Sequence, residues 1–313
     1  MFALREIVVS LTFFILLYCL LSALVAVAWR SLKLLPATEQ SLPALLFALR
    51  VLPLAASVVI TFAFVVPSFQ LLEPRSIGEG MGAMPLTLSV CALLLIARGC
   101  FRVITAQART SRVVACWLGG AHPLNVDAGA QTVTFRSGRE APPLTLVGVR
   151  RPRVLVSEST VALLSHDELH IAIKHELAHM RSRDNLKKLV FHFCPFPGMA
   201  GLESAWSQAA ELAADDAAVS NLGDALDLAA ALVKLSRLVP VEAASICTVG
   251  FVTGSISARV ARLLAWNEAS KAQRTRIRPW HAIPLVLVAL LCGVVTYGPT
   301  LALTHEVTER LVR

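Results

Sequence analysis

Four stretches of the chain contain no Asp, Glu, Lys or Arg, and each is long enough to cross a membrane as a helix. They cover residues 7–29, 51–72, 80–97 and 279–305 of a 313-residue sequence. A helix of about 20 apolar residues spans the hydrocarbon core of a bilayer. Hydrophobic residues make up 56% of the chain and the mean hydropathy is +0.66, which excludes an ordinary soluble enzyme. We therefore predict four membrane spans.

Two of these stretches have an alternative interpretation. In the stretch 80–97, Pro85 lies near the start and Arg98 directly follows the end, so a re-entrant or interfacial segment is the alternative to a full span. The stretch 7–29 contains Ala26-Val27-Ala28, which also fits the cleavage site of a signal peptide. Its apolar run is longer than such peptides have, which favours a span.

The basic residues indicate the orientation of the chain, because Lys and Arg beside membrane spans tend to stay on the cytoplasmic side. Both ends of segment 98–278 are basic, with Arg98, Arg102, Arg109 and Arg112 at one end and Lys271, Arg274, Arg276 and Arg278 at the other. We expect this segment to be cytoplasmic, beneath a cell (inner) membrane, with the N-terminus and the short tail 306–313 outside. The net charge of +8 is then explained by attraction to anionic lipid headgroups. The sequence has no zinc-finger spacing that would predict nucleic-acid binding.

The three predicted parts of the chain are a membrane domain over 1–97, one compact domain over 98–278 and the last span. Alternating residues predict short strands over 113–156, around Val113-Val114, Thr132-Val133-Thr134-Phe135 and Val154-Leu155-Val156. Ser165 and Glu168 form a capping-box pattern that begins a helix running to about residue 183. Further helices are expected over 203–219 and 226–238. Strands followed by helices indicate an α+β domain, inserted between the membrane helices of a mainly α chain.

Seven cysteines occur in the chain, and none of them forms a Cys-x-x-Cys pair. Their odd number and scattered positions argue against a disulfide framework. A zinc site built from cysteines is also not expected, so any metal site must use other ligands.

The helix predicted from residue 165 contains the sequence His175-Glu176-Leu177-Ala178-His179. Histidines four residues apart lie on one face of a helix, so both imidazoles can bind one metal ion. Glu176 lies beside a ligand and can accept a proton from water that the metal activates, which is the role of a general base. The alternative is a solvated helix face that carries two histidines by chance.

A pair of carboxylates on the next predicted helix supports the metal site. Glu211 and Asp215 are four residues apart, and Glu211 follows His179 by 32 residues. Catalytic zinc takes three protein ligands and keeps one open position, so His175, His179 and Glu211 are the expected ligands of one Zn²⁺ ion. We expect Asp215 to accept the second N–H of a ligand histidine. Zinc is favoured over other first-row metals by this ligand set.

In the order of its parts the chain resembles the BlaR/MecR-type membrane zinc metallopeptidases. The resemblance rests on three spans before the metal motif, on Asp184 and the aromatic stretch from Phe191 to Pro195 after it, on Glu211 and Asp215, and on a final span. The stretch Arg259-Val260-Ala261-Arg262 resembles a further family feature. The resemblance implies a gluzincin-like fold and a membrane protease that cleaves itself or a cytoplasmic repressor after a signal from outside.

One feature of that family's antibiotic sensors is not found in this sequence. Their penicillin-binding domain lies beyond the last span, whereas this sequence ends at Arg313. No lysine here has a serine three positions before it, as a penicillin-binding serine requires. We therefore expect no direct acylation by β-lactams.

Three further expectations concern residues around the motif. His192 is the candidate donor to the oxyanion, because Tyr18 and Tyr297 both lie in predicted spans. Asp184 is expected to cap a helix or to pair with a nearby arginine. A peptide substrate is expected to pair with the edge of the strand at 154–156.

Two other functions fit the same motifs. One is a membrane protease of the HtpX or CAAX-protease kind, which would act in quality control or processing. The other is a receptor or scaffold in which zinc only stabilises the fold. Loss of function in a Glu176→Gln variant separates an enzyme from such a scaffold.

Overall fold

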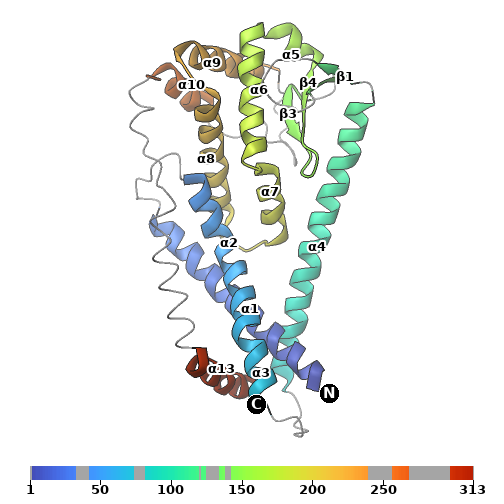
Figure 1. Cartoon of the computed structure of the whole chain (residues 1–313), viewed down its shortest axis with the longest axis vertical. Coiled ribbons are helices and arrows are strands. Elements are labelled where there is room, and N and C mark those ends of the chain that lie inside the picture. The colour runs from blue at the N-terminus through green and yellow to red at the C-terminus, as the bar shows by residue number, and fades with distance from the viewer. Residues whose placement is uncertain are drawn as a thin grey trace.

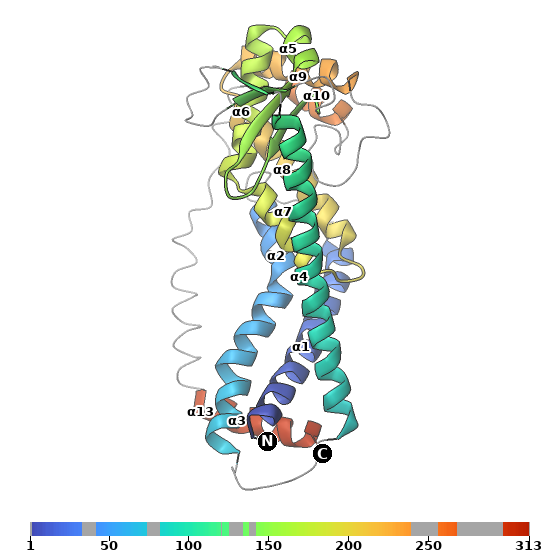
Figure 2. The same ribbon diagram turned by 90° about the vertical axis from the view of Figure 1, so that its right-hand side faces the viewer.

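The computed structural model describes residues 2–32, 42–73, 82–119, 121–124, 134–137, 142–238, 256–267 and 297–312. The molecule is elongated and mostly helical (Figure 1). Long helices form its lower half, and a small sheet with shorter helices forms its upper half. Figure 2 shows the same division from the side, with the lower end of α8 reaching down to the membrane helices.

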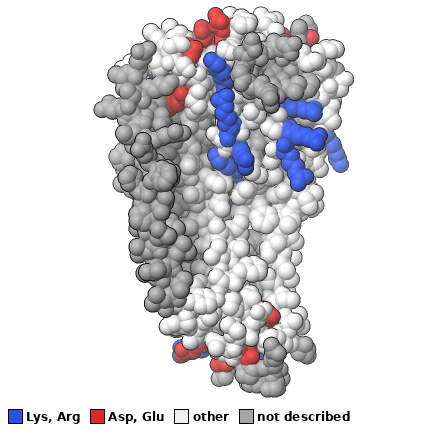
Figure 3. Space-filling model, viewed as in Figure 1, with Lys and Arg blue, Asp and Glu red and all other residues white. Residues whose placement is uncertain are grey.

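Three helical segments are long and apolar enough to cross a membrane, which indicates a membrane protein. The first is α1 (Phe2–Leu32). The second consists of α2 (Leu42–Ile60), the π-helical turn η1 (Thr61–Val65) and α3 (Val66–Leu72). The third is α4 (Ala83–Leu118). They agree with the first three predicted spans, and Figure 3 shows a broad band without charged side chains over the lower half of this face.

Helix α4 is longer than the sequence analysis predicts. It continues for 36 residues, through Arg98 and through Val113-Val114, which were expected to form a strand. Few helix-breaking residues occur after Pro85, and alanine, leucine and arginine have high helix propensity, so the charges that end the apolar stretch do not end the helix. The prediction that the membrane segment and the helix both end at 97 is therefore wrong for the helix.

The predicted fourth span, 279–305, lies outside the described residues as far as 296. Residues 297–305 form the first part of α13 (Tyr297–Val312), which lies across the lower ends of the three membrane helices (Figure 1). Tyr297 donates a hydrogen bond to the carbonyl oxygen of Ala63 at 3.0 Å. His305 lies between Glu73 and Glu309, with nitrogen–oxygen distances of 3.9 and 3.8 Å.

The sheet contains β1 (His122–Leu124), β2 (Thr134–Ser137), β3 (Leu144–Val147) and β4 (Arg153–Ser157). Its strand order is β1-β2-β4-β3, with β2 and β4 parallel and the other two pairs antiparallel. The predicted strand at 154–156 is confirmed as β4, but it lies between β2 and β3. Its backbone is therefore paired on both sides, and the expectation that a substrate binds its edge is wrong. The outer strand on this side is β3.

Six described helices complete the upper domain, namely α5 (Glu158–Leu163), α6 (His166–Arg181), α7 (Asp184–Phe193), α8 (Ala200–Ala218), α9 (Leu222–Ser236) and α10 (Ile256–Leu264). The predicted helices therefore correspond to α6, α8 and α9. The capping box of α6 is present, because Ser165 Oγ accepts from the amide of Glu168 and Glu168 accepts from the amide of Ser165. An apolar core joins β3 and β4 to α6 and α9, and includes Ile173 and Leu232.

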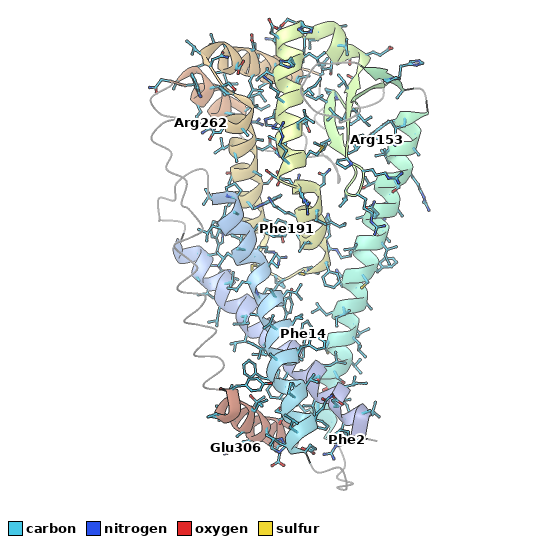
Figure 4. The ribbon with its side chains drawn as sticks, viewed as in Figure 1. Phe2, Phe14, Arg153, Phe191, Arg262 and Glu306 are labelled. Atoms are coloured by element: carbon cyan, nitrogen blue, oxygen red, sulfur yellow. The ribbon has the colours of Figure 1, made fainter. Side chains whose placement is uncertain are left out.

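A second core joins the upper domain to the membrane helices. Phe191 of α7 packs edge-on against Trp206 of α8 at 5.0 Å between ring centroids and against Phe47 of α2 at 5.6 Å. In Figure 4 Phe191 lies where the two halves of the molecule meet. Helices α4 and α7 touch at Gly99, where a Cβ atom would overlap the carbonyl oxygen of Phe193. The lower part of the domain thus rests directly on the membrane helices.

Candidate metal centre

Helix α6 places the whole His175–His179 motif in the interior of the domain. Its neighbours are β3 on one side and α8 and α9 on the other, so the face that carries the motif is covered. His175, Glu176 and His179 are at most 1% exposed. A solvated helix face, the alternative interpretation of the motif, is therefore excluded.

Three potential ligand atoms converge between α6 and α8. The Nε2 atoms of His175 and His179 lie 3.1 Å apart. Glu211 directs Oε2 to within 3.5 Å of the first nitrogen and Oε1 to within 3.6 Å of the second. Ligands at 2.0–2.1 Å around a tetrahedral zinc ion are separated by roughly 3.3 Å. This buried group can hold a metal ion, as expected, and its spacing fits one face of a zinc tetrahedron.

The other nitrogen of each histidine faces a carboxylate. His175 Nδ1 lies 3.0 Å from Asp215 Oδ1, and His179 Nδ1 lies 2.8 Å from Asp184 Oδ2. Carboxylates accept hydrogen bonds, so Nδ1 is the ring nitrogen that favours hydrogen in each case, and Nε2 is the nitrogen left to bind a metal ion. Two imidazole nitrogens and a carboxylate that point at one another favour a cation among them, either a proton or a metal ion.

The contacts of Asp184 differ from those predicted from the sequence. Instead of capping a helix or pairing with a neighbouring arginine, it contacts His179 and accepts from Lys187 Nζ at 3.0 Å. The reason is the backbone between α6 and α7, where Arg183 adopts a left-handed conformation with φ 54°. This turn brings Asp184 back over the end of α6. The spacing of five residues after His179 did not by itself indicate the contact.

Arg259 of α10 connects the two carboxylates of α8. Its Nε and Nη2 bind Asp215 at 2.8 and 2.5 Å, and its Nη1 binds Glu211 Oε2 at 2.9 Å. Arg262, one turn further along α10, binds Asp216 at 2.5 Å and is labelled beside α8 in Figure 4. From the sequence, the two arginines were identified only as part of the resemblance, and these contacts were not predicted. Their signal was an Arg-x-x-Arg spacing that places both on one helix face.

Glu176 is held by the outer edge of the sheet. Its Oε2 accepts a hydrogen bond from the amide of Leu146 in β3 at 2.9 Å. Its Oε1 is buried and has no hydrogen-bond partner in the described part of the chain. Burial raises the pKa of this carboxyl, although the nearby histidines oppose the shift. One fixed and one free oxygen leave Glu176 able to accept a proton from a group beside the histidines.

The pKa values of His179 and Glu211 also indicate that this group of residues favours a positive charge. Burial opposes a charge on His179, but hydrogen bonds with Asp184 and Glu211 outweigh it and raise its pKa to about 10. Burial likewise opposes the charge of Glu211, yet both histidines hold its pKa well below the ordinary value. A positive charge at this position is therefore stabilised, whether a proton or a metal ion carries it.

His192 lies apart from this group. It lines a cavity between α4 and α7 and, among the described residues, forms no hydrogen bond or ion pair with the three potential ligands. Its assignment as an oxyanion donor stays a prediction. The structure thus brings together His175, Glu176, His179, Glu211 and Asp215, and adds Asp184 and Arg259.

Comparison with known proteins adds no relative to this description. The sequence matches no family model, and a search of curated proteins found no similar chain.

Proposed function

We propose that this chain is an integral-membrane zinc metalloendopeptidase that hydrolyses peptide bonds at the cytoplasmic face of the membrane. The observation that carries the proposal is the buried triangle of His175, His179 and Glu211 with the free oxygen of Glu176 beside it. Two histidines and a glutamate are a ligand set of catalytic zinc, with a fourth position for water or substrate. A zinc site that only stabilises a fold has four protein ligands as a rule.

Each residue has a defined task in this reaction. Bound zinc would polarise the peptide carbonyl and make water more acidic. Glu176 takes the proton from that water through Oε1 and later gives it to the leaving amine. Asp215 and Asp184 hold the two histidines in the tautomer that presents Nε2. Arg259 keeps Glu211 and Asp215 in place and is a positioning residue.

The location and the substrate follow from the membrane helices and from the resemblance. The basic residues of α4 favour the cytoplasmic side for the metal centre, with the N-terminus outside. The resemblance to BlaR/MecR-type proteases favours a relay in which the enzyme cleaves itself or a cytoplasmic repressor. A quality-control protease would instead cleave many unfolded membrane proteins. Proteins captured by an inactive Glu176→Ala variant separate these two, because a relay predicts one dominant partner.

The deciding experiment measures metal content and cleavage in detergent-purified full-length protein. Wild type and Glu176→Gln should both contain about one zinc per chain, and only wild type should cleave itself or a substrate. His175→Ala should lose both zinc and cleavage. His166→Ala is the matched control on the same helix, because that side chain is 89% exposed. Absence of zinc from wild type overturns the proposal, and equal activity of Glu176→Gln leaves only a structural metal.

A further inference from the structure

A cavity lies between the membrane helix α4 and helix α7, next to the end of β3. Its volume is about 70 Å³, and the polar side chains among its lining residues belong to Gln107, Thr110, Asn185, Lys188 and His192. A cavity needs roughly 10–15 Å³ to hold one water molecule, so this one has room for a group the size of phosphate. None of the residues of the metal centre lines it.

The lining is suited to an anion. Lys188 and His192 contribute an ammonium group and an imidazole, Gln107 contributes an amide, and no aspartate or glutamate lines the cavity. Asn185 donates to the carbonyl oxygens of Leu146 and Gly148, so two backbone acceptors near the cavity are already bonded.

The electrostatic surroundings of His192 point the same way. Its pKa lies below the ordinary value, first because of burial and then because of the positive charges of Arg102 and Lys188, while Glu203 opposes the shift. A local excess of positive charge disfavours another cation and favours an anion. The neutral imidazole still has one N–H to donate.

The position along α4 puts the cavity at the level of lipid headgroups. The apolar part of α4 begins at Ala83, and about 20 residues cross the hydrocarbon core, which places its end near Arg102. Phe101 and Ile104 are 67% and 65% exposed, as expected for side chains that face lipid. Gln107 and Thr110 lie about 7.5 and 12 Å beyond Arg102 at 1.5 Å per residue, so the cavity opens at the outer edge of the headgroup layer. Figure 3 shows Lys and Arg side chains gathered at the right, beside the upper half of α4.

We propose that this cavity binds the phosphate group of an anionic phospholipid, with Lys188 and His192 as its contacts. Basic pockets beside membrane helices on the cytoplasmic side recognise such headgroups. Helix α7 supplies the contacts and also begins with Asp184, which holds His179. A bound lipid would tie α7 to α4 and so link membrane composition to the metal centre. The proposal does not depend on peptidase activity.

The test titrates delipidated full-length protein in detergent micelles with phosphatidylglycerol and measures the thermal midpoint of unfolding. Phosphatidylglycerol should raise the midpoint of wild type, and Lys188→Gln should increase the half-saturating lipid concentration at least tenfold. Lys188→Arg should restore binding because the positive charge returns. Arg112→Gln is the matched control, since it removes an exposed charge near the same level of α4 outside the cavity.

Four outcomes would overturn the proposal. An equal response of wild type and Lys188→Gln shows that the lipid acts elsewhere. A full response to phosphatidylcholine shows that no anionic headgroup is required. If inorganic phosphate alone raises the midpoint to the same plateau, the cavity binds a soluble phosphate ion. If an acidic peptide raises the midpoint and phosphatidylglycerol does not, the cavity binds a peptide substrate. His192→Gln, checked for folding by circular dichroism, repeats the test independently of Lys188.

Discussion

Two arginines, one at the membrane and one at the metal centre, hold helix α8 at different points, and they are equally buried at 2% exposure. Arg259 binds Glu211 and Asp215 in the upper domain. Arg50 of α2 binds Glu203, eight residues earlier in α8, at 2.8 Å. It also donates to the carbonyl oxygen of Cys194 and lies 5.6 Å from the ring centre of Phe191. Helix α8 therefore connects the membrane helices to the candidate ligand Glu211.

The two sites differ in how the charges are compensated. Arg259 faces two carboxylates that are almost fully buried, whereas Glu203 is 37% exposed and can be solvated without its arginine. Removing one partner of a buried ion pair is costly because the other charge is left without compensation. The burial of the arginine alone therefore does not determine how much stability is lost when the arginine is replaced. The exposure and the remaining contacts of its partners do, and three of the four substitutions below test this statement.

The largest effect is expected for Arg259→Met. The change removes the arginine that bridges the buried carboxylates Glu211 and Asp215, so the free energy of unfolding should fall by about 3–5 kcal/mol. Zinc content should fall too, because Glu211 loses the contact that orients it. Chemical denaturation and metal analysis measure the two effects. Arg262→Met serves as the control, and a loss as large as that of Arg259→Met would contradict the assignment.

A smaller effect is expected for Arg50→Met. Glu203 can turn to water, so the main cost is the carbonyl oxygen of Cys194 left without its donor, about 1–3 kcal/mol. Thermal unfolding of the protein in micelles measures it. A double-mutant cycle with Glu203→Gln should show a weak coupling between the two side chains. The comparison fails if Arg50→Met destabilises the protein more than Arg259→Met does.

Asp184→Asn tests the metal centre without removing a ligand. The amide can no longer accept a charge-assisted hydrogen bond from His179, and loss of such a partner lowers metal affinity by about 10–100-fold. Competition with a chelator of known affinity gives the zinc dissociation constant. Asp216→Asn is the control, because that carboxylate binds Arg262. Equal zinc dissociation constants for the two variants would show that Asp184 does not support the metal centre.

The smallest effect is expected for the outer ion pair of Lys234 and Glu168, which are 2.7 Å apart. Lys234 is 38% exposed, and the buried Glu168 keeps the amide of Ser165 as a donor when Lys234 is removed. Burial raises the pKa of Glu168, but hydrogen bonds with Lys234 and Ser165 lower it below the ordinary value. The pair therefore stabilises the fold above the ordinary pKa of glutamate, and the contribution is lost as pH falls through the lowered one. Lys234→Met should cost only about 0.2–1 kcal/mol at pH 7 and less at pH 3, measured by urea unfolding. An equal cost at both pH values would show that charge is not involved.

The parts predictable from the sequence are those that a single helix determines. Two histidines or two carboxylates four residues apart share a helix face wherever the helix lies. The requirement of catalytic zinc for a third protein ligand then predicted that the two faces meet. The contact of Asp184 could not be predicted, because it depends on the left-handed turn at Arg183.

Longer-range features needed the fold itself. Arg259 reaches Asp215 across 44 residues of sequence, and no local pattern specifies that pairing. The end of α4 was misplaced because charge marks where a helix leaves the membrane, not where the helix ends. The order of strands, which places β4 inside the sheet, also depends on pairing between distant segments.

The outer edge of β3 has a consequence for the behaviour of the protein at high concentration. An uncovered edge strand offers free amides and carbonyls to strands of other molecules and so promotes aggregation. Here Glu176 takes the amide of Leu146, and Asn185 takes the carbonyl oxygens of Leu146 and Gly148. The glutamate to which we attribute proton transfer thereby also helps to prevent neighbouring copies from joining their sheets in a crowded membrane.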